Sequence, residues 1–279
     1  MDEEMHLVRK EGNMGDVIST GYPSTYATTV SFAYSPPQRV PGIDCSVWQD
    51  DNSTPQKMDF GKAVAAGARF VFIKASQGTW LDEDFTYNWK AAKEAGLYRG
   101  AYHYLDWSAL GKVQADFFCG VLRNDPGELA PVVDYECRKN VTKDAILWLN
   151  TFLAVLRGER GEVMIYTSPD YWKNYGSTNE YYALFPLWIA NHDAIKPIVP
   201  KPWTDWTFWQ WTDKGDGRKY GAESAGLDMN WYNGDWSDFT KILLGLVHPP
   251  DITIPEDEYD RGWNDCVAEA TERIEGLYR

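Results

Sequence analysis

The chain has 279 residues, of which 44% are hydrophobic and 24% charged, and its formal net charge is −14. This composition is that of a globular protein long enough to bury a sizeable core. The acidity argues against nucleic acids and anionic membranes as partners because both attract basic patches, and no apolar run approaches the ~18 residues of a membrane span.

Aromatic residues make up 15% of the chain, with 14 Trp and 17 Tyr. Part of this excess is expected in the core, and part is suited to stack on the apolar face of a sugar ring. The four cysteines, at positions 45, 119, 137 and 266, form no CxxC pair and no metal-binding spacing with the histidines. We therefore expect reduced thiols, although an even number of cysteines also permits disulfides, and we expect neither a metal nor another cofactor.

The chain divides into three segments. Residues 1–40 are rich in Ser, Thr, Gly and Pro and are predicted to be an N-terminal extension. Residues 41–247 alternate between strand and helix patterns, whereas residues 248–279 form a tail with nine acids and three arginines. An amphipathic helix stripe with 4-3-4-3 spacing is predicted in this tail, and its members are Trp263, Val267, Ala270, Ile274 and Leu277.

The middle segment predicts eight strands. They are Val40–Asp44, Arg69–Ala75, Tyr98–Tyr104, Ala130–Glu136, Val163–Thr167, Leu187–Ala190, Thr207–Trp211 and Gly226–Asn230. The predicted helices are Pro55–Ala68, Asp82–Leu97, Gln114–Arg123, Thr142–Arg157 and Trp236–Leu244. Strands alternating with helices predict a parallel α/β sheet, and eight strands favour a closed barrel over a doubly wound sheet.

Polar side chains gather at the ends of these predicted strands. In such barrels the active groups lie at the carboxyl ends of the strands. Nine polar residues lie at those ends, and four of them are acids. The nine are Asp44, Lys74, His103, Asp134, Glu136, Tyr166, Asn191, Gln210 and Asp228. Their convergence on one end of a barrel predicts an acidic catalytic site.

The stretch Pro131–Glu136 places two of these acids at one strand end. Side chains alternate between the faces of a strand, so Asp134 and Glu136 share a face, with their Cβ atoms ~6–7 Å apart. Crowding separates the pKa values of two carboxyls, so that one keeps its proton beside one that has lost it. Glycoside cleavage needs such a pair, although a solvated strand end also accounts for two acids.

Six short stretches then occur in a characteristic order: Gly42–Ser46, Phe72–Gly78, Arg99–Tyr104, Asp134–Glu136, Trp209–Trp211 and Leu227–Asn230. Together they resemble glycoside hydrolase family 25, the lysozymes that include many phage and bacterial muramidases, over roughly residues 40–245. The resemblance implies a flattened, TIM-like (β/α) barrel with fewer helices than strands. It also implies peptidoglycan strands as the partner, cleaved at the β-1,4 bond between N-acetylmuramic acid and N-acetylglucosamine.

The resemblance also implies the roles of individual residues. Glu136 matches the general acid of the family and Asp134 its partner carboxylate, while Asp44 and Asp228 match two further acids of the site. The candidates for substrate binding are Tyr166, Trp188, Gln210, His103 and Tyr104.

Two roles for Asp134 stay open. It attacks the anomeric carbon directly, or it orients the 2-acetamido group of the substrate, which then attacks in its place. The two-residue spacing on a single strand favours the second role. Lys74 is omitted from the site because a lysine at a strand end is more often a paired charge.

Two other functions fit part of the pattern: a chitinase-like glycosidase, and a glycan-binding barrel without catalysis. The first residues contain no apolar core of a signal peptide. This favours a product that stays in the host cytoplasm until lysis, or one exported by a non-classical route, and that acts on the cell wall. The apolar stripe of the tail needs a partner, so we expect it to dock on the barrel or to self-associate.

Overall fold

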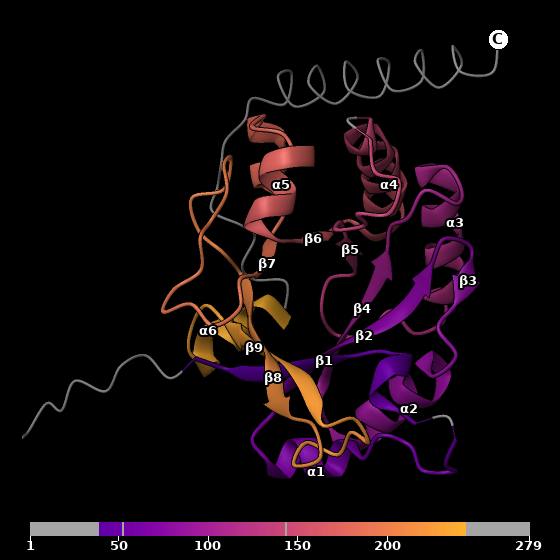
Figure 1. Ribbon diagram of the computed structural model, residues 1–279, viewed down its shortest axis with the longest axis vertical. Helices are drawn as coiled ribbons and strands as arrows, with labels where there is room; N and C mark the ends of the chain where they lie inside the picture. The colour runs from indigo at the N-terminus through magenta and orange to yellow at the C-terminus, as the bar shows by residue number, and fades with distance from the viewer. Residues whose placement is uncertain (1–38, 52, 143, 244–279) are drawn as a thin grey trace, which may run out of the picture. The chain divides into compact units, whose positions relative to one another are not determined.

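The computed structural model describes residues 39–243, except for residues 52 and 143 (Figure 1). The N-terminal extension, and the tail with its predicted helix stripe, lie outside the described residues. The domain boundaries after residues 40 and 247 therefore stay predictions. Within the described part, no helix has both the length and the apolar character to cross a membrane.

Nine strands of the described residues form a single sheet in the order β1-β9-β8-β7-β6-β5-β4-β2-β3, and the pairing of β1 with β2 closes it. The short β3 only extends the end of β2 as a hairpin, so eight strands make the barrel. The strands are β1 (Pro41–Cys45), β2 (Phe70–Gln77), β3 (Trp80–Leu81), β4 (Tyr98–Tyr104), β5 (Val132–Asp134), β6 (Met164–Thr167), β7 (Leu187–Ala190), β8 (Phe208–Asp216) and β9 (Gly226–Tyr232).

The described part holds six α-helices, so the prediction of an α/β barrel with fewer helices than strands is confirmed. They are α1 (Phe60–Ala65), α2 (Phe85–Ala95), α3 (Gly111–Val121), α4 (Ala145–Arg160), α5 (Pro169–Tyr175) and α6 (Trp236–Leu243), with 3-10 turns η1 (Val47–Gln49) and η2 (Glu180–Leu184). The sequence reading missed α5, although Ser168 caps it and Pro169 occupies its first turn.

The barrel is mixed rather than fully parallel, because β9 runs antiparallel to both β8 and β1. The connection from β8 to β9 spans only residues 217–225 and contains no helix. So short a connection joins antiparallel neighbours, whereas a parallel crossover needs a dozen or more residues. The first residues of β9 therefore lie at the end of the barrel where β1 finishes, and Asp228 is paired with Asp44.

The inside of the barrel is filled mainly by aromatic rings. Phe72 stacks on Trp188 at 4.3 Å between ring centroids, and Phe70 and Phe72 each meet Phe208 edge to face at 5.0 Å. Gly42 leaves the space for one of these rings, since a Cβ there would overlap Phe70. The barrel interior is therefore filled by packed side chains, and these support the residues at the carboxyl ends of the strands.

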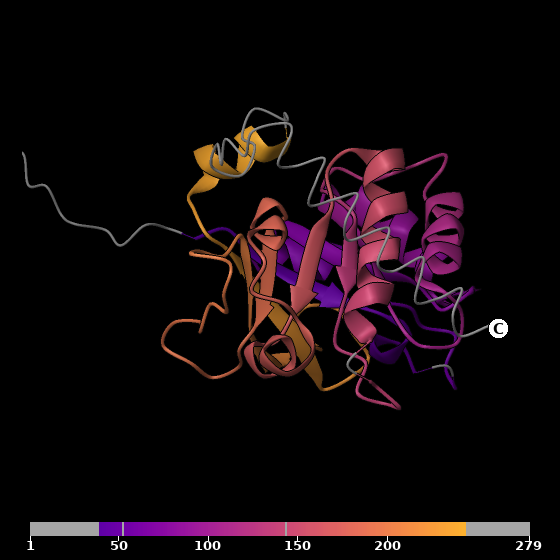
Figure 2. The ribbon, with the colours of Figure 1, turned by 90° about the horizontal axis from the view of Figure 1, so that it is seen from above.

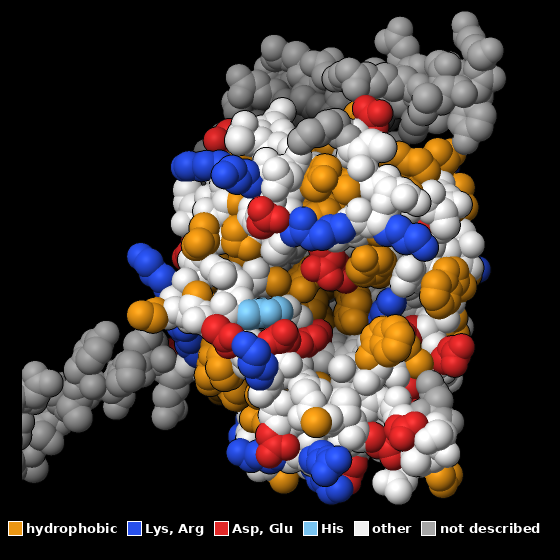
Figure 3. Space-filling model, in the orientation of Figure 1, with side chains coloured by type: hydrophobic (Ala, Val, Ile, Leu, Met, Phe, Trp, Pro, Cys, Tyr) orange, Lys and Arg blue, Asp and Glu red, His pale blue; other side chains and the backbone are white. Residues whose placement is uncertain are grey.

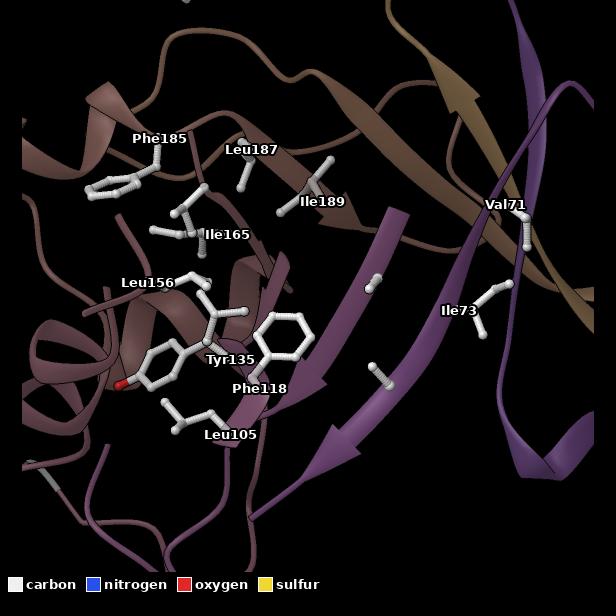
Figure 4. Packing of buried hydrophobic residues seen from close by; sticks show 14 of the residues in the cluster. Val71, Ile73, Leu105, Phe118, Tyr135, Leu156, Ile165, Phe185, Leu187 and Ile189 are labelled. Atoms are coloured by element: carbon white, nitrogen blue, oxygen red, sulfur yellow. The ribbon is translucent and has the colours of Figure 1, made fainter. Parts of the chain in front are cut away.

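A second apolar core lies between the outer face of the sheet and the helices. Figure 4 shows Tyr135 among Leu105, Phe118 and Leu156, which come from the β4 end, α3 and α4. Figure 2 shows α3 and α4 side by side over this face of the sheet. Because Tyr135 points outward into this core, its neighbours along the chain are directed to the inner side of the barrel.

Candidate active site

The strands carry apolar residues low in the barrel and polar ones at its carboxyl end. On β2 the inner face reads Phe70, Phe72 and then Lys74, while Val71 and Ile73 belong to the outer core. The strict alternation of a strand produces this arrangement. A polar side chain such as Lys74, two residues after the buried ring of Phe72, therefore lies next to the apolar core of the barrel at its carboxyl end.

Asp44, at the end of β1, is held by two amides. Its Oδ2 accepts hydrogen bonds from Gln210 Nε2 at 2.9 Å and from Asn230 Nδ2 at 2.7 Å. Its carboxyl also shares a hydrogen bond with Asp228, which adds to the rise in the pKa of Asp44 and partly offsets the larger rise that burial causes in the pKa of Asp228. A hydrogen bond between two carboxyls needs one proton, so Asp44 and Asp228 form a pair that shares it.

A second layer of donors fixes both amides. Gln210 Oε1 accepts from the Tyr166 hydroxyl and from His192 Nε2, each at 2.9 Å. Asn230 Oδ1 accepts from Trp188 Nε1 at 2.8 Å. Because each amide oxygen is engaged by a donor, the amide nitrogens must face Asp44. Tyr166 and Trp188 thus lie on the floor of the site, and their predicted contact with substrate stays a prediction.

Asp134 and Glu136 form the other half of the site. Asp134 ends β5 between Tyr104 and Tyr166 and is 5% exposed, while Glu136 follows two residues later and is half-buried. Within the described part of the chain, no side chain or backbone group donates a hydrogen bond to the Asp134 carboxyl, and its Oδ1 is sealed from solvent. The carboxyls of Asp134 and Glu136 therefore accept no hydrogen bond from a described residue.

All four carboxyls have raised pKa values. Burial is the main cause for each one, because it penalises the charged form. Repulsion between neighbours adds to this, from Asp228 on Asp44 and Glu136, and from Glu136 on Asp134. A site with four crowded carboxyls keeps protons into the range where a general acid is useful.

Lys74 is a cation at this end of the barrel, although the sequence analysis omitted it from the site. Its Nζ donates to Gln77 Oε1 at 2.9 Å and lies 5.2 Å from the ring centre of Tyr104. Its positive charge lowers the pKa values of Asp134 and Glu136, against the larger effect of burial. The structure therefore adds Lys74, and with it Asn230 and His192, to the residues around the acids.

His103 is a correction to the predicted site. It is fully buried on the outer face of β4, where Nδ1 meets Ser76 Oγ at 2.8 Å and Nε2 meets Gln114 Oε1 at 3.0 Å. Its ring packs between Phe118 and Phe152 of α3 and α4. Adjacent residues of a strand face opposite ways, so His103 and Tyr104 cannot both line the groove.

Figure 3 shows the opening of the site as a hollow bordered by acidic side chains, with a histidine and hydrophobic side chains at its edge. Two exposed tryptophans flank this end of the barrel. Trp48 lies in η1 directly after β1 and is 78% exposed, and Trp80 in β3 pairs with the end of β2 and is 56% exposed. The described residues contain no cluster of three or more His, Cys, Asp or Glu arranged to hold a metal.

The ionisation of Asp134 predicts an unusual stability change. A carboxyl with a raised pKa in the folded protein destabilises it above the unfolded pKa, and this penalty grows as the pH rises through the folded pKa. Removing the buried charge in Asp134→Asn should therefore stabilise the protein at pH 7 by about 1–2 kcal/mol, or roughly 3–6 °C in Tm. Thermal melts at pH 7 and in acid measure this effect.

In acid near pH 3, Asp134 is protonated in both states, so the two proteins should melt together. The matched control is Asp116→Asn, because Asp116 lies on the surface of α3 with a 55% exposed side chain and, among the described residues, forms an ion pair only with Lys112. This control should leave Tm almost unchanged at either pH. A lower Tm for Asp134→Asn at pH 7 would contradict the assignment of Asp134 as an unpaired carboxylate.

A closed α/β barrel with four crowded carboxyls at its carboxyl end is a frame suited to glycoside hydrolysis. The profile of glycosyl hydrolases family 25 matches residues 43–219 of the chain. Lysozyme M1 of Streptomyces globisporus is 34% identical over 209 residues, which cover 70% of this chain and 68% of that protein. The N,O-diacetylmuramidase of Chalaropsis sp is 30% identical, covering 74% of this chain and 100% of that protein.

Solved structures give the same result. The bacterial lysozyme from Streptomyces coelicolor superposes with a TM-score of 0.64 at 29% identity, covering 75% of this chain and 98% of that one. The muramidase from Acremonium alcalophilum gives a TM-score of 0.62 at 31% identity, with 74% and 100% covered. The chain belongs to glycosyl hydrolases family 25, and it is a glycoside hydrolase.

Proposed function

We propose that the chain is a muramidase that cleaves the β-1,4 bond between N-acetylmuramic acid and N-acetylglucosamine of peptidoglycan, and that it acts on the cell wall. The names of the family 25 relatives support this substrate. The observation that carries the chemistry is the pair Asp134 and Glu136, two buried or half-buried carboxyls with raised pKa values that lie beside Asp44 and Asp228.

Glu136 is proposed as the general acid and base. It has a raised pKa and accepts no hydrogen bond from a described residue, so its proton is available to the glycosidic oxygen as the bond from that oxygen to the anomeric carbon breaks. The acetamido oxygen of the substrate attacks the anomeric carbon and closes an oxazolinium ring, whose positive charge the Asp134 carboxylate stabilises. Glu136 then takes a proton from water, which opens this ring with net retention.

The remaining groups support this sequence. Asp44 and Asp228 hold charge and water in the groove, and Lys74 keeps Asp134 ionisable against its burial. Trp48 and Trp80 present exposed rings on which sugar rings can stack on either side of the acids. The runner-up, a chitinase-like glycosidase, shares the acid pair but matches the flanking stretches and the family less well.

The test is the identity of the sugar that hydrolysis leaves at the reducing end. Digests of purified peptidoglycan, reduced with borohydride and analysed by mass spectrometry, should carry the reduced form of N-acetylmuramic acid. Zymography should show clearing of cell walls and none of chitin. Reduced N-acetylglucosamine in the digest, or clearing of chitin, would show a different bond specificity, and binding without any product would show an inactive glycan-binding barrel.

A further inference from the structure

A second cavity of about 490 Å³ lies at the opposite end of the barrel from the carboxyls. It is formed where β6, β7 and β8 begin and β9 ends, and Ile242 of α6 closes one side. Its apolar lining includes Met164, Leu187 and Phe208. Cavities of 300–1,000 Å³ with such a lining are sites for apolar groups, and nothing in the proposed chemistry uses this one.

We propose that residues 244–255 of this chain occupy the cavity. The segment starts in the right place because α6 ends at Leu243, one residue beyond Ile242 in the cavity wall. Its twelve residues reach up to ~40 Å when extended, which is more than the width of such a cavity. Residues 244–255 are therefore close enough to the cavity along the chain to enter it.

The sequence of the tail separates this segment from the rest of it. Residues 244–255 carry Leu244, Leu246, Val247, Ile252 and Ile254 and a single acid, whereas residues 256–279 carry eight acids and three arginines. The cavity has an acidic rim, formed by Glu162, Glu180 and Asp205. An acid-poor, apolar segment fits such a cavity, while the acidic helix pattern that follows is repelled by its rim.

The N-terminal segment is a competing occupant, since Arg39 lies over the ring of Trp206 at 5.1 Å and Trp206 lines the cavity. The stretch before Arg39, Ser35-Pro36-Pro37-Gln38, carries no aromatic or long aliphatic side chain to fill the cavity. A second copy of the chain would have to displace the covalently attached residues 244–255, whose effective concentration is far higher. Both alternatives remain as arms of the test.

The experiment compares full-length variants. Leu246→Asp/Val247→Asp should lower Tm by about 5 °C or more, because two apolar side chains lose their buried site. Hydrogen exchange of the backbone amides of residues 183, 185, 187 and 203–207, which line the cavity, should accelerate by at least ~10-fold. The matched control, Ile274→Asp/Leu277→Asp, should change neither, and a chain lacking residues 1–38 should keep the same amide protection.

The outcomes separate the occupants. If the control pair or the removal of residues 1–38 exposes the cavity amides instead, the acidic helix or the N-terminal segment is the occupant and the proposal is wrong. A doubled mass by light scattering, with a Tm that rises with protein concentration, would assign the cavity to a second copy. Unchanged melting and exchange in Leu246→Asp/Val247→Asp would likewise overturn the proposal, while wild-type kcat in that variant is expected because the cavity is remote from the acids.

Discussion

Glu136→Gln should lower kcat on purified peptidoglycan by about 10²–10⁴-fold, the usual contribution of a general acid. The amide has the size of the carboxyl but no proton to give to the glycosidic oxygen. The side chain makes no hydrogen bond to a described residue, so the substitution breaks no structural contact there, and the loss should fall on kcat with KM little changed. Initial rates from the release of reducing ends measure both constants.

The matched control is Glu94→Gln, because Glu94 lies on the surface of α2 with a 67% exposed side chain and, within the part that the structure describes, forms an ion pair only with Lys90. This variant should retain wild-type rates and melting. Full activity in Glu136→Gln would remove Glu136 from the reaction and with it the whole assignment of the acid pair.

Asp134→Asn should be almost as severe, with a kcat loss of ~10²-fold or more, since preorganised charge at the reacting atoms is a large part of catalysis. The amide cannot stabilise the positive charge that develops as the acetamido group attacks. Because the same variant is expected to melt higher at pH 7, a loss of activity cannot be attributed to unfolding. Stability and activity should therefore change in opposite directions at this residue.

The stereochemistry of the product tests which chemical role Asp134 has, whereas the kcat of Asp134→Asn tests only how much the reaction depends on it. Attack by the acetamido group gives a β anomer first, which proton NMR detects before mutarotation, and it leaves no glycosyl adduct on Asp134. An α anomer formed first would mean inversion by an activated water, with Asp44 or Asp228 as the base. A covalent adduct on Asp134, found by mass spectrometry, would make it the nucleophile instead.

The sequence by itself determined the strands and the direction of their side chains. Short apolar runs located all eight barrel strands, although β8 extends five residues beyond its predicted end, and the alternation of side chains along a strand placed Asp134 and Glu136 on one face. The same period of two excluded His103 from the groove once Tyr104 was placed there, but the sequence reading did not apply it. The Ser168-Pro169 start of α5 was also present in the sequence, and only its short length hid it.

Only the tertiary structure decided which strands are neighbours and in which direction they run. Asp228 reaches Asp44 because β9 is antiparallel, a fact that depends on hairpin length and barrel closure rather than on any local pattern. The supporting contacts of Gln210 and Asn230 with Asp44 join residues 166 and 186 positions apart. Burial, which raises the pKa values of the acids, is likewise a property of the closed barrel, since it depends on the packed chain around each carboxyl and not on the neighbours in sequence.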